Sequence, residues 1–179
     1  VNVLRSILKK GLHDVIKAHK PDVICLQETR INTPDASSLL AELGNYQVLA
    51  SAAQRPGYSG VMTLVRRGIK VRNWRSGLKA SGKASIFESE GRILVAEFAG
   101  FDLYNLYIPS GTSGQSRQNF KYRFLDALLA HLQGLGTAKR DRIILCGDFN
   151  ICHRELDIHH PATATRLKLT GFLPRERAW

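Results

Sequence analysis

The sequence has few of the features that mark membrane, secreted or zinc-binding proteins. No apolar run reaches about 18 residues, so no transmembrane helix is expected. Only three cysteines occur, Cys25, Cys146 and Cys152, and none forms a CxxC pair, which argues against a disulfide framework and against a zinc site. A reducing cytoplasm is therefore the expected compartment. The start of the chain has neither an initiator methionine nor the apolar segment of a signal peptide, so we expect it to begin inside a longer protein.

Acidic residues are also scarce. Asp and Glu number 15 against 26 Lys and Arg, which gives a formal net charge of +11 over 179 residues. Such an excess predicts a polyanionic partner whose binding weakens as salt is added. Nucleic acid is the leading candidate, and a membrane surface or an acidic small molecule is the alternative.

Apolar residues repeat with the period of a helix in some segments and with that of a strand in others. Interleaved helices and strands, with a hairpin that turns at Ala99 and Gly100, predict one α/β domain over residues 1–179 with a mixed sheet. With 44% apolar residues, the chain is long enough to bury a core of its own. The expected strands are 22–26, 46–50, 60–65, 69–74, 92–98, 101–107 and 143–146, and the expected helices are 7–19, 33–43 and 117–132, with a loop over 75–89.

Polar side chains follow two apolar runs that we expect to be buried strands. Residues 143–146 lead into Gly147-Asp148-Phe149-Asn150, and Leu26-Gln27 leads into Glu28. Gly147 allows a sharp turn or a close approach to a ligand. Strand ends are also where α/β folds place their chemistry. The same residue types equally suit a plain turn or a solvated strand end.

Two tyrosines stand at comparable positions. Tyr107 ends the second strand of the hairpin, and Tyr58 precedes another strand. The Tyr107 hydroxyl is placed either to reach a ligand or to cap the edge of the core. Together with two carboxylates and an amide, these oxygens suit Mg²⁺, which keeps several waters and takes one or two protein carboxylates. Without a cluster of His or Cys, zinc or iron is not expected.

Six short segments occur in order along nearly the whole chain. They are Leu-Gln-Glu-Thr (26–29), Tyr-Ser-Gly-Val (58–61), Glu-Gly-Arg (90–92), Tyr-Ile-Pro-Ser-Gly (107–111), Gly-Asp-Phe-Asn-Ile (147–151) and Gly-Phe-Leu-Pro-x-Glu-Arg-Ala-Trp (171–179). Together they resemble the exonuclease III family, the apurinic/apyrimidinic (AP) endonucleases of the endonuclease/exonuclease/phosphatase superfamily. The first and fifth are shared with superfamily phosphatases and sphingomyelinases, whereas Tyr-Ser-Gly-Val and Gly-Phe-Leu-Pro favour DNA repair. The resemblance implies a four-layered α/β sandwich of the DNase I type, with two mixed β-sheets packed face to face and helices outside.

The resemblance also implies an enzyme that uses Mg²⁺, or Mn²⁺ in its place. It would hydrolyse the phosphodiester 5′ to an abasic site and act on 3′ ends as a 3′–5′ exonuclease and 3′-phosphodiesterase. Glu28 would be the principal metal carboxylate, with Asp148 and Asn150 as further ligands. Asp148 would also activate or position the attacking water, Asn150 would hold that water or a phosphate oxygen, and Tyr107 would stabilise charge on the phosphate. The implied partner is double-stranded DNA with abasic sites or 3′ ends, bound by a monomer without a membrane, and in a bacterium the protein would be nucleoid-associated.

Four residues are candidates for gripping the duplex: Tyr58, Arg92, Arg117 and Lys121. The alternative for Arg117 and Lys121 is a solvated face of the 117–132 helix, and the alternative for Arg92 is a surface ion pair with Glu90. Selection of an abasic nucleotide would follow from its extrusion out of the duplex into the active site. Extruding a nucleotide without a base costs less, because no base stacking is lost.

The chain departs from the family at both ends. It starts inside the segment Asn-x-Asn/Asp-Gly-x-Arg, where Asn2 matches but Val3 replaces Gly, and it lacks the Ser-Asp-His segment that supplies the family's catalytic histidine. His153 is outside that motif, so we do not assign it this role. We expect a domain truncated at both ends, with sheet edges left unpaired. Two alternatives stay open: a superfamily phosphoesterase acting on inositol phosphates or lipids, and a catalytically inactive DNA-binding remnant.

Overall fold

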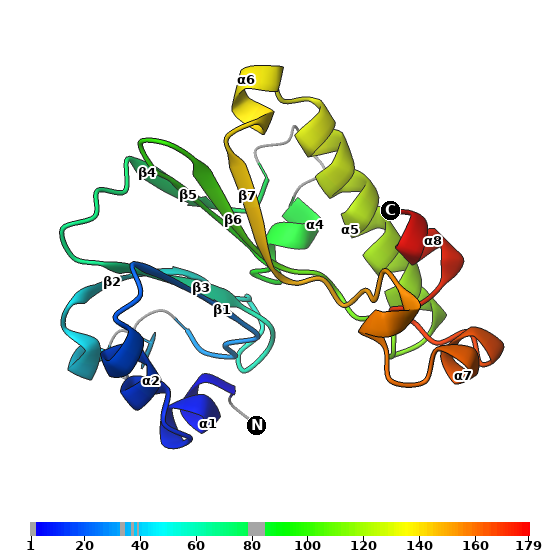
Figure 1. The fold of residues 1–179 in the computed structure, drawn as a ribbon, viewed down its shortest axis with the longest axis horizontal. Helices are drawn as coiled ribbons and strands as arrows, with labels where there is room; N and C mark the ends of the chain where they lie inside the picture. The colour runs from blue at the N-terminus through cyan, green and yellow to red at the C-terminus, as the bar shows by residue number, and fades with distance from the viewer. Residues whose placement is uncertain (1–2, 33–34, 37, 39, 79–84) are drawn as a thin grey trace. The chain divides into compact units, whose positions relative to one another are not determined.

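The described residues contain seven strands in two β-sheets (Figure 1). The computed structural model describes residues 3–32, 35–36, 38, 40–78 and 85–179, so the prediction for Asn2 lies outside it. The contacts divide the chain into two units, one of Val1–Tyr107 with Leu135–Gly147 and one of Ile108–Gly134 with Asp148–Trp179. Both sheets belong to the first unit, apart from the last residue of the last strand.

The first sheet is antiparallel, in the order β1-β3-β2, and the second is mixed, in the order β4-β5-β6-β7. β6 and β7 run parallel, because Asp102 N donates to Arg142 O and, further along both strands, Ile108 N donates to Asp148 O. The strands are β1 (Val23–Gln27), β2 (Tyr46–Ser51), β3 (Val61–Arg66), β4 (Asn73–Ser76), β5 (Ile93–Glu97), β6 (Asp102–Tyr107) and β7 (Ile143–Asp148).

The two sheets pack face to face. Alternate side chains of a strand point to opposite sides of its sheet, so residues an even number of positions apart lie on the same face. Val61 and Val65 of β3 share a hydrophobic cluster with Leu94 and Ala96 of β5, so this cluster is a core between the sheets. The predicted α/β fold class, with two sheets packed against each other, is confirmed.

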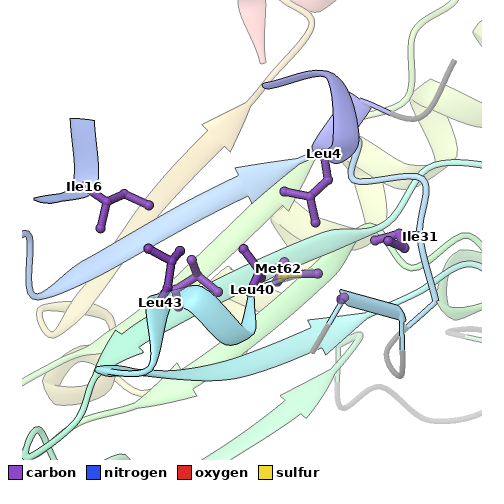
Figure 2. Close-up of a cluster of buried hydrophobic side chains, with 8 residues drawn as sticks. Leu4, Ile16, Ile31, Leu40, Leu43 and Met62 are labelled. Atoms are coloured by element: carbon purple, nitrogen blue, oxygen red, sulfur yellow. The ribbon is translucent and has the colours of Figure 1, made fainter. Parts of the chain in front are cut away.

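The opposite face of the first sheet is covered by helices α1 (Val3–Lys9) and α2 (Leu12–His19). Figure 2 shows the cluster on this face, which includes Leu4 of α1, Ile16 of α2 and Met62 of β3. These helices lie outside the sheet, as predicted.

Two predicted elements have different boundaries in the structure. The helix predicted over 7–19 is two helices, because Gly11 adopts a left-handed conformation with φ of 93° between them. The strand predicted over 69–74 begins only at Asn73, and Ile69 instead packs against the core between the sheets as part of a connection.

Two further predictions fall partly outside the described residues. In the helix predicted over 33–43, Thr33, Pro34 and two later positions are not described. The last residues of this segment form a short 3₁₀ helix, η1 (Ala41–Leu43). The loop predicted over 75–89 contains the short helix α4 (Ser85–Glu88), and its residues 79–84 are not described.

β1 and β7 are edge strands. Both were predicted to be buried, but neither strand is fully buried. Every residue of β1 is half-buried, and Ile144 of β7 is 47% exposed. Among the described residues each has one neighbouring strand, β3 for β1 and β6 for β7. An apolar run indicates a buried strand only where both of its edges and both of its faces are covered.

The second unit is built around the helix α5 (Gln115–Gln133), in which Phe120, Phe124 and Leu128 are buried at the predicted spacing. Trp179 Nε1 donates to Leu125 O at 3.1 Å and so ties the end of the described chain to this helix. None of the described helices is long and apolar enough to cross a membrane. The remaining helices are α6 (Thr137–Arg140) in the first unit and η2 (Glu155–Asp157), α7 (Pro161–Arg166) and α8 (Pro174–Ala178) in the second.

Candidate active site

The predicted site residues divide between the two units. Within each unit, hydrogen bonds and ring contacts join most of them into a local group. The first unit carries Glu28, Tyr58, Arg92 and Tyr107, and the second carries Arg117, Lys121, Asp148 and Asn150.

Glu28 directly follows β1 and has a left-handed backbone, with φ of 52°. The next two residues are held by backbone hydrogen bonds. Thr29 N donates to Gly60 O at 3.1 Å, and Arg30 N donates to Ser59 O at 2.8 Å. Glycine suits position 60, because its φ of 87° is left-handed and a Cβ there would lie 2.7 Å from Thr29 Oγ1. The Tyr-Ser-Gly segment therefore fixes the turn that presents Glu28.

The Glu28 carboxylate is paired with Arg30. Both Nε, at 3.1 Å, and Nη2 of Arg30 donate to Glu28 Oε1. This hydrogen bond and the charge of Glu28 raise the pKa of Arg30. Arg30 is not among the predicted site residues, although a basic residue two positions after a strand-end acid is visible in the sequence.

Arg92 is the buried centre of a cluster of half-buried side chains. Its side chain is 3% exposed, and its Nε lies 2.5 Å from Glu90 Oε2. Its Nη2 donates to Tyr58 OH at 3.2 Å, and its Nη1 donates to Tyr107 O at 3.1 Å. A side chain with so little exposed area cannot grip a duplex, so that prediction for Arg92 is corrected. The alternative, an ion pair with Glu90, is confirmed, although the pair is not at the surface.

Arg92 also stacks on both tyrosines of the predicted site. Its Cζ lies 4.4 Å from the ring centroid of Tyr107 and 5.7 Å from that of Tyr58. A guanidinium over an aromatic face is attracted by the ring, and more strongly when both are shielded from water. Arg92 therefore positions Tyr58 and Tyr107 relative to each other.

A polar link between residues outside the predicted site crosses the sandwich beside Glu28. Gln27 Nε2 donates to Asn105 Oδ1 at 2.8 Å, and Asn105 Nδ2 donates to Met62 O at 2.9 Å. Asn105 is fully buried in β6, two residues before Tyr107. The link fixes the end of β1 against the end of β6. Its signal in the sequence is one amide, Asn105, inside a predicted strand.

A cavity of about 320 Å³ opens beside Tyr58. Arg5, Arg30 and Arg55 line it, and Arg55 Cζ lies 5.6 Å from the ring centroid of Tyr58. Three guanidinium groups around one cavity favour an anion such as a phosphate. Asp35, whose carboxylate lies 4.0 Å from Arg5, is the acid that lines the same cavity.

Asp148 and Asn150 contact each other at the end of β7. Asn150 N donates to Asp148 Oδ1 at 2.9 Å, and Asn150 Nδ2 donates to Asp148 Oδ2 at 3.3 Å. The same Nδ2 donates to Ile108 O at 2.8 Å. Asn150 has a left-handed backbone, with φ of 51°, a conformation that Asn adopts more readily than most residues. The structure thus brings this predicted pair together and fixes both side chains.

Gly147 is required by the close approach of β7 to β6. Its φ is 141°, and a Cβ there would lie 1.9 Å from Leu106 O. The close approach predicted for this glycine therefore exists, and the group that it approaches is the backbone of the neighbouring strand.

Lys121 does not lie on a solvated helix face. Its side chain has no exposed area, and its Nζ lies 2.5 Å from Glu176 Oε1. Nζ also donates to Asn150 O at 2.8 Å. The prediction that Lys121 contacts DNA directly is therefore corrected. Arg117 is half-buried, with its Cζ 4.4 Å from the Phe120 ring centroid, and stays a candidate for DNA contact.

His153 has a structural partner. Its Nδ1 lies 3.2 Å from Arg177 O, and Arg177 Nε donates to His153 O at 2.9 Å. These two contacts join the loop after Asn150 to α8. They account for His153 without a catalytic role.

Oxygen atoms are the only metal donors that the predicted site offers. Among the described residues, no group of three or more His, Cys, Asp and Glu side chains is placed to hold a metal ion. The first unit offers the Glu28 carboxylate, and the second unit offers the Asp148 carboxylate and the Asn150 amide oxygen. Glu28 already accepts a cationic partner, Arg30. Hard oxygen atoms of this kind are the donors that Mg²⁺ and Mn²⁺ take in proteins.

Comparison with known proteins relates the whole chain to one family. The model of the Endonuclease/Exonuclease/phosphatase family matches residues 2–179. DNA repair nuclease APEX1 of Danio rerio is 32% identical over 179 residues, which are 99% of this chain and 54% of the relative. An exodeoxyribonuclease of Bacillus subtilis (strain 168) is 29% identical over 178 residues, 99% of this chain and 66% of the relative. The chain thus spans about half to two thirds of the length of these curated relatives.

Solved structures share the fold. An AP endonuclease from Archaeoglobus fulgidus superposes with a TM-score of 0.77 at 24% identity, over 99% of this chain and 65% of that one. AP endonuclease LMAP from Leishmania major gives a TM-score of 0.73 at 26% identity, over 98% and 61%. The likeness supports the predicted sandwich. The prediction of a single domain over 1–179 stays a prediction.

Proposed function

The chain belongs to the endonuclease/exonuclease/phosphatase family, and from this we propose that it is part of a metal-dependent DNA repair nuclease. The proposed reaction is hydrolysis of the phosphodiester 5′ to an abasic site, with 3′–5′ exonuclease and 3′-phosphodiesterase activity at the same site. The names of the relatives, a DNA repair nuclease and an exodeoxyribonuclease, support this proposal. The net charge of +11 supports a nucleic acid as the substrate.

The observation that carries the proposal is the contact between Asp148 and Asn150. Two hydrogen bonds from Asn150 hold the carboxylate in one orientation on an exposed strand end. In the proposed mechanism Asp148 takes a proton from the attacking water, as a positioned general base does. The amide oxygen of Asn150, which accepts no hydrogen bond from the described residues, holds that water or a phosphate oxygen.

Glu28, Asp148 and Asn150 are the residues that would hold Mg²⁺. When bound, the ion would polarise a phosphate oxygen and neutralise part of its charge. Glu28 contributes a carboxylate whose direction is set by the turn between β1 and the Tyr-Ser-Gly segment. Tyr107 contributes a hydroxyl that donates to the phosphate oxygen as its charge grows. Arg92 contributes by fixing the Tyr107 ring.

The cavity lined by Arg5, Arg30, Arg55 and Tyr58 would receive a backbone phosphate of the duplex. Arg117 would contact another phosphate. Such contacts fix the register of the protein on DNA without reading sequence. Selection of an abasic nucleotide would follow from its low cost of extrusion from the helix. The proposed state is a monomer bound to duplex DNA or to a 3′ end.

The test is incision of a duplex that carries one synthetic abasic site, with Mg²⁺ and with EDTA. Asp148→Asn is measured beside the wild type, because asparagine keeps the shape and the contact with Asn150 N but cannot take the proton. We expect a loss of about 10²- to 10⁴-fold in rate with duplex binding retained. Asp157→Asn, which alters an acid that caps Arg154 N, is the matched control and should cleave normally.

Three outcomes would contradict the proposal. The first is Mg²⁺-independent incision, and the second is equal incision by Asp148→Asn and the wild type. The third is faster hydrolysis of an inositol phosphate or a phospholipid head group than of the abasic duplex. Salt-sensitive duplex binding without any incision would instead indicate an inactive DNA-binding remnant.

A further inference from the structure

Lys121 and Glu176 form an ion pair in which neither side chain has any exposed area. The pair joins α5 to α8 within the second unit, with 2.5 Å between Nζ and Oε1. Removing two charges from water costs several kcal/mol per ion, so a buried pair is a poor device for stability alone. Such a pair is better explained by what it holds in place.

The two charges hold two separate loops. On one side, Lys121 Nζ donates to Asn150 O at 2.8 Å. On the other side, Glu176 Oε2 accepts hydrogen bonds from Gly171 N at 2.6 Å and from Leu173 N at 3.0 Å. The ion pair therefore connects the loop that carries Asn150 with the loop that precedes α8.

Neutral side chains also contact the oxygen of Glu176 that pairs with Lys121. Gln118 Nε2 donates to Glu176 Oε1 at 3.0 Å, and Thr170 Oγ1 lies 3.3 Å from the same oxygen. Thr170 Oγ1 also donates to Gln118 Oε1 at 2.6 Å. A buried polar network of this kind can specify one arrangement of its surroundings.

The two loops also contact each other directly. Cys152 N donates to Gly171 O at 2.7 Å, and a Cβ at Gly171 would lie 3.1 Å from Asn150 O. The backbone of Asn150 is thus enclosed between Lys121 and Gly171 in its left-handed conformation. That conformation is the one in which the side chain of Asn150 reaches Asp148 and Ile108.

We propose that Lys121 and Glu176 are positioning residues that hold Asn150, and through it Asp148, in the geometry needed for cleavage. The proposal rests on the proposed function, which assigns the chemistry to Asp148 and Asn150. Neither Lys121 nor Glu176 touches the substrate. The competing explanation is that the pair only stabilises the packing of α5 against α8.

The test uses the double variant Lys121→Met/Glu176→Gln. It leaves no unpaired buried charge, and glutamine can still accept the hydrogen bonds from Gly171 and Leu173, but the donor to Asn150 O is lost. We expect kcat for incision of an abasic duplex to fall by about 10- to 100-fold, because small displacements of catalytic groups are costly. KM should stay within about twofold, since no substrate contact is removed.

The chain offers a matched control on the same two helices. Arg175 of α8 and Asp126 of α5 form an ion pair at 3.0 Å that is exposed on both sides. Asp126→Asn removes a charge pair between α5 and α8 without touching Asn150. It should leave kcat, KM and hydrogen exchange unchanged.

A second background separates positioning from packing. If Lys121 acts through the Asn150 side chain, the double variant should cause no further loss of kcat when Asn150 is already alanine. An equal loss in the Asn150→Ala background would overturn the proposal, because a packing defect acts whatever residue stands at position 150.

Hydrogen exchange of residues 148–152 gives a readout that does not depend on activity. We expect these amides to exchange faster by about tenfold or more in the double variant than in Asp126→Asn, because their closed conformation has lost a support. Unchanged exchange would overturn the positioning role even in an active enzyme. If the wild type does not cleave at all, the proposed function fails, and the exchange result alone decides whether the pair holds the loop.

Glu176→Asp replaces the double variant if the latter does not fold. Aspartate keeps the charge, but its shorter side chain cannot reach Lys121 and the amides of Gly171 and Leu173 together. A folded Glu176→Asp protein with reduced kcat at unchanged KM supports the proposal. The same protein with unchanged kcat and unchanged exchange overturns it.

Discussion

The guanidinium carbon of Arg92 lies 4.4 Å from the ring centroid of Tyr107, and the same guanidinium donates a hydrogen bond to the Tyr107 carbonyl oxygen. One buried cation thus fixes both the ring and the backbone of this tyrosine. Glu90 balances the charge. Arg92 therefore affects the proposed chemistry through Tyr107 and not through contact with DNA.

Arg92→Lys should lower the rate of incision by about tenfold or more, because an ammonium group cannot replace a planar group that donates in three directions. Duplex affinity should stay within about twofold of the wild type, since the side chain is buried. Single-turnover cleavage and fluorescence anisotropy measure the two quantities.

Arg75→Lys is the matched control for this prediction. Arg75 also pairs with a glutamate, Glu97, and lies over a tyrosine ring, that of Tyr104, but it contacts none of the predicted site residues. Equal losses of rate in the two variants would show that any arginine of this kind matters only for folding. A loss of duplex affinity in Arg92→Lys alone would restore the DNA-binding role.

Glu28→Ala should raise the Mg²⁺ concentration needed for half-maximal incision by about 10- to 100-fold, as loss of a group that organises a metal site does. High Mg²⁺ should restore part of the rate, because an ion that keeps several waters can bind with one carboxylate fewer. The measurement is a metal titration of incision, with Mn²⁺ binding followed by electron paramagnetic resonance.

Asp22→Ala is the control for Glu28→Ala, because Asp22 precedes the same strand at its other end and forms an exposed ion pair with Arg66. Its metal titration should match that of the wild type. If no concentration of Mg²⁺ restored incision by Glu28→Ala and Mn²⁺ binding were unchanged, Glu28 would not be a metal ligand.

Local patterns predicted the elements, but they did not predict which charged residues are buried. The hairpin of β5 and β6 and the helix α5 were predicted because their periodicity lies within one segment. Strand ends and motif order likewise indicated Asp148 and Asn150. The burial of Lys121 depends on Glu176, which lies 55 positions further along the chain. Because lysine is almost never fully buried without a partner, a single helix gives no sign of such a pair.

The two edge strands show the same limit. β1 and β7 each begin with a run of four apolar residues, as fully buried strands do, yet both strands are only partly buried. Sequence period reports the preferences of one strand, whereas burial depends on how many neighbours the strand has. The predictions that failed are DNA contact by Arg92 and Lys121 and full burial of β1 and β7. Each of them concerns the partners of a residue or strand and not its local structure.

The stability of the protein should depend on pH through Glu176. Burial alone raises the pKa of Glu176, but hydrogen bonds from Lys121, Gln118 and the Leu173 N–H outweigh it and leave the pKa below its ordinary value. A folded pKa below the unfolded one gives stabilisation that is complete above the unfolded value, about 4.3. This stabilisation is lost as the pH falls through the folded value.

We therefore expect the difference in thermal midpoint between the wild type and Glu176→Gln to be largest at neutral pH and to shrink below about pH 4. Circular dichroism melts between about pH 2 and pH 7 measure it. For Asp126→Asn, which alters an exposed pair, the difference from the wild type should be small throughout. A difference for Glu176→Gln that does not change with pH would mean that Glu176 is not ionised in the folded protein.

Gly147→Ala should be among the most damaging substitutions of one methyl group in this chain. A Cβ at this position would lie 1.9 Å from Leu106 O, and the φ of 141° is one that side chains with a Cβ rarely adopt. The added atom meets backbone and not a flexible side chain, so β7 must move away from β6. We expect a loss of about 3 kcal/mol or more in the free energy of unfolding by urea.

Gly100→Ala is the control, because a Cβ there would meet nothing within 4 Å and the glycine lies in the turn between β5 and β6. It should change the stability by no more than about 0.5 kcal/mol. The position of Gly147 next to Asp148 makes a second readout possible: a folded Gly147→Ala protein should also lose incision, because a shift of β7 moves the proposed base. If Gly147→Ala matched Gly100→Ala in stability, the close packing of β7 on Leu106 would be wrong.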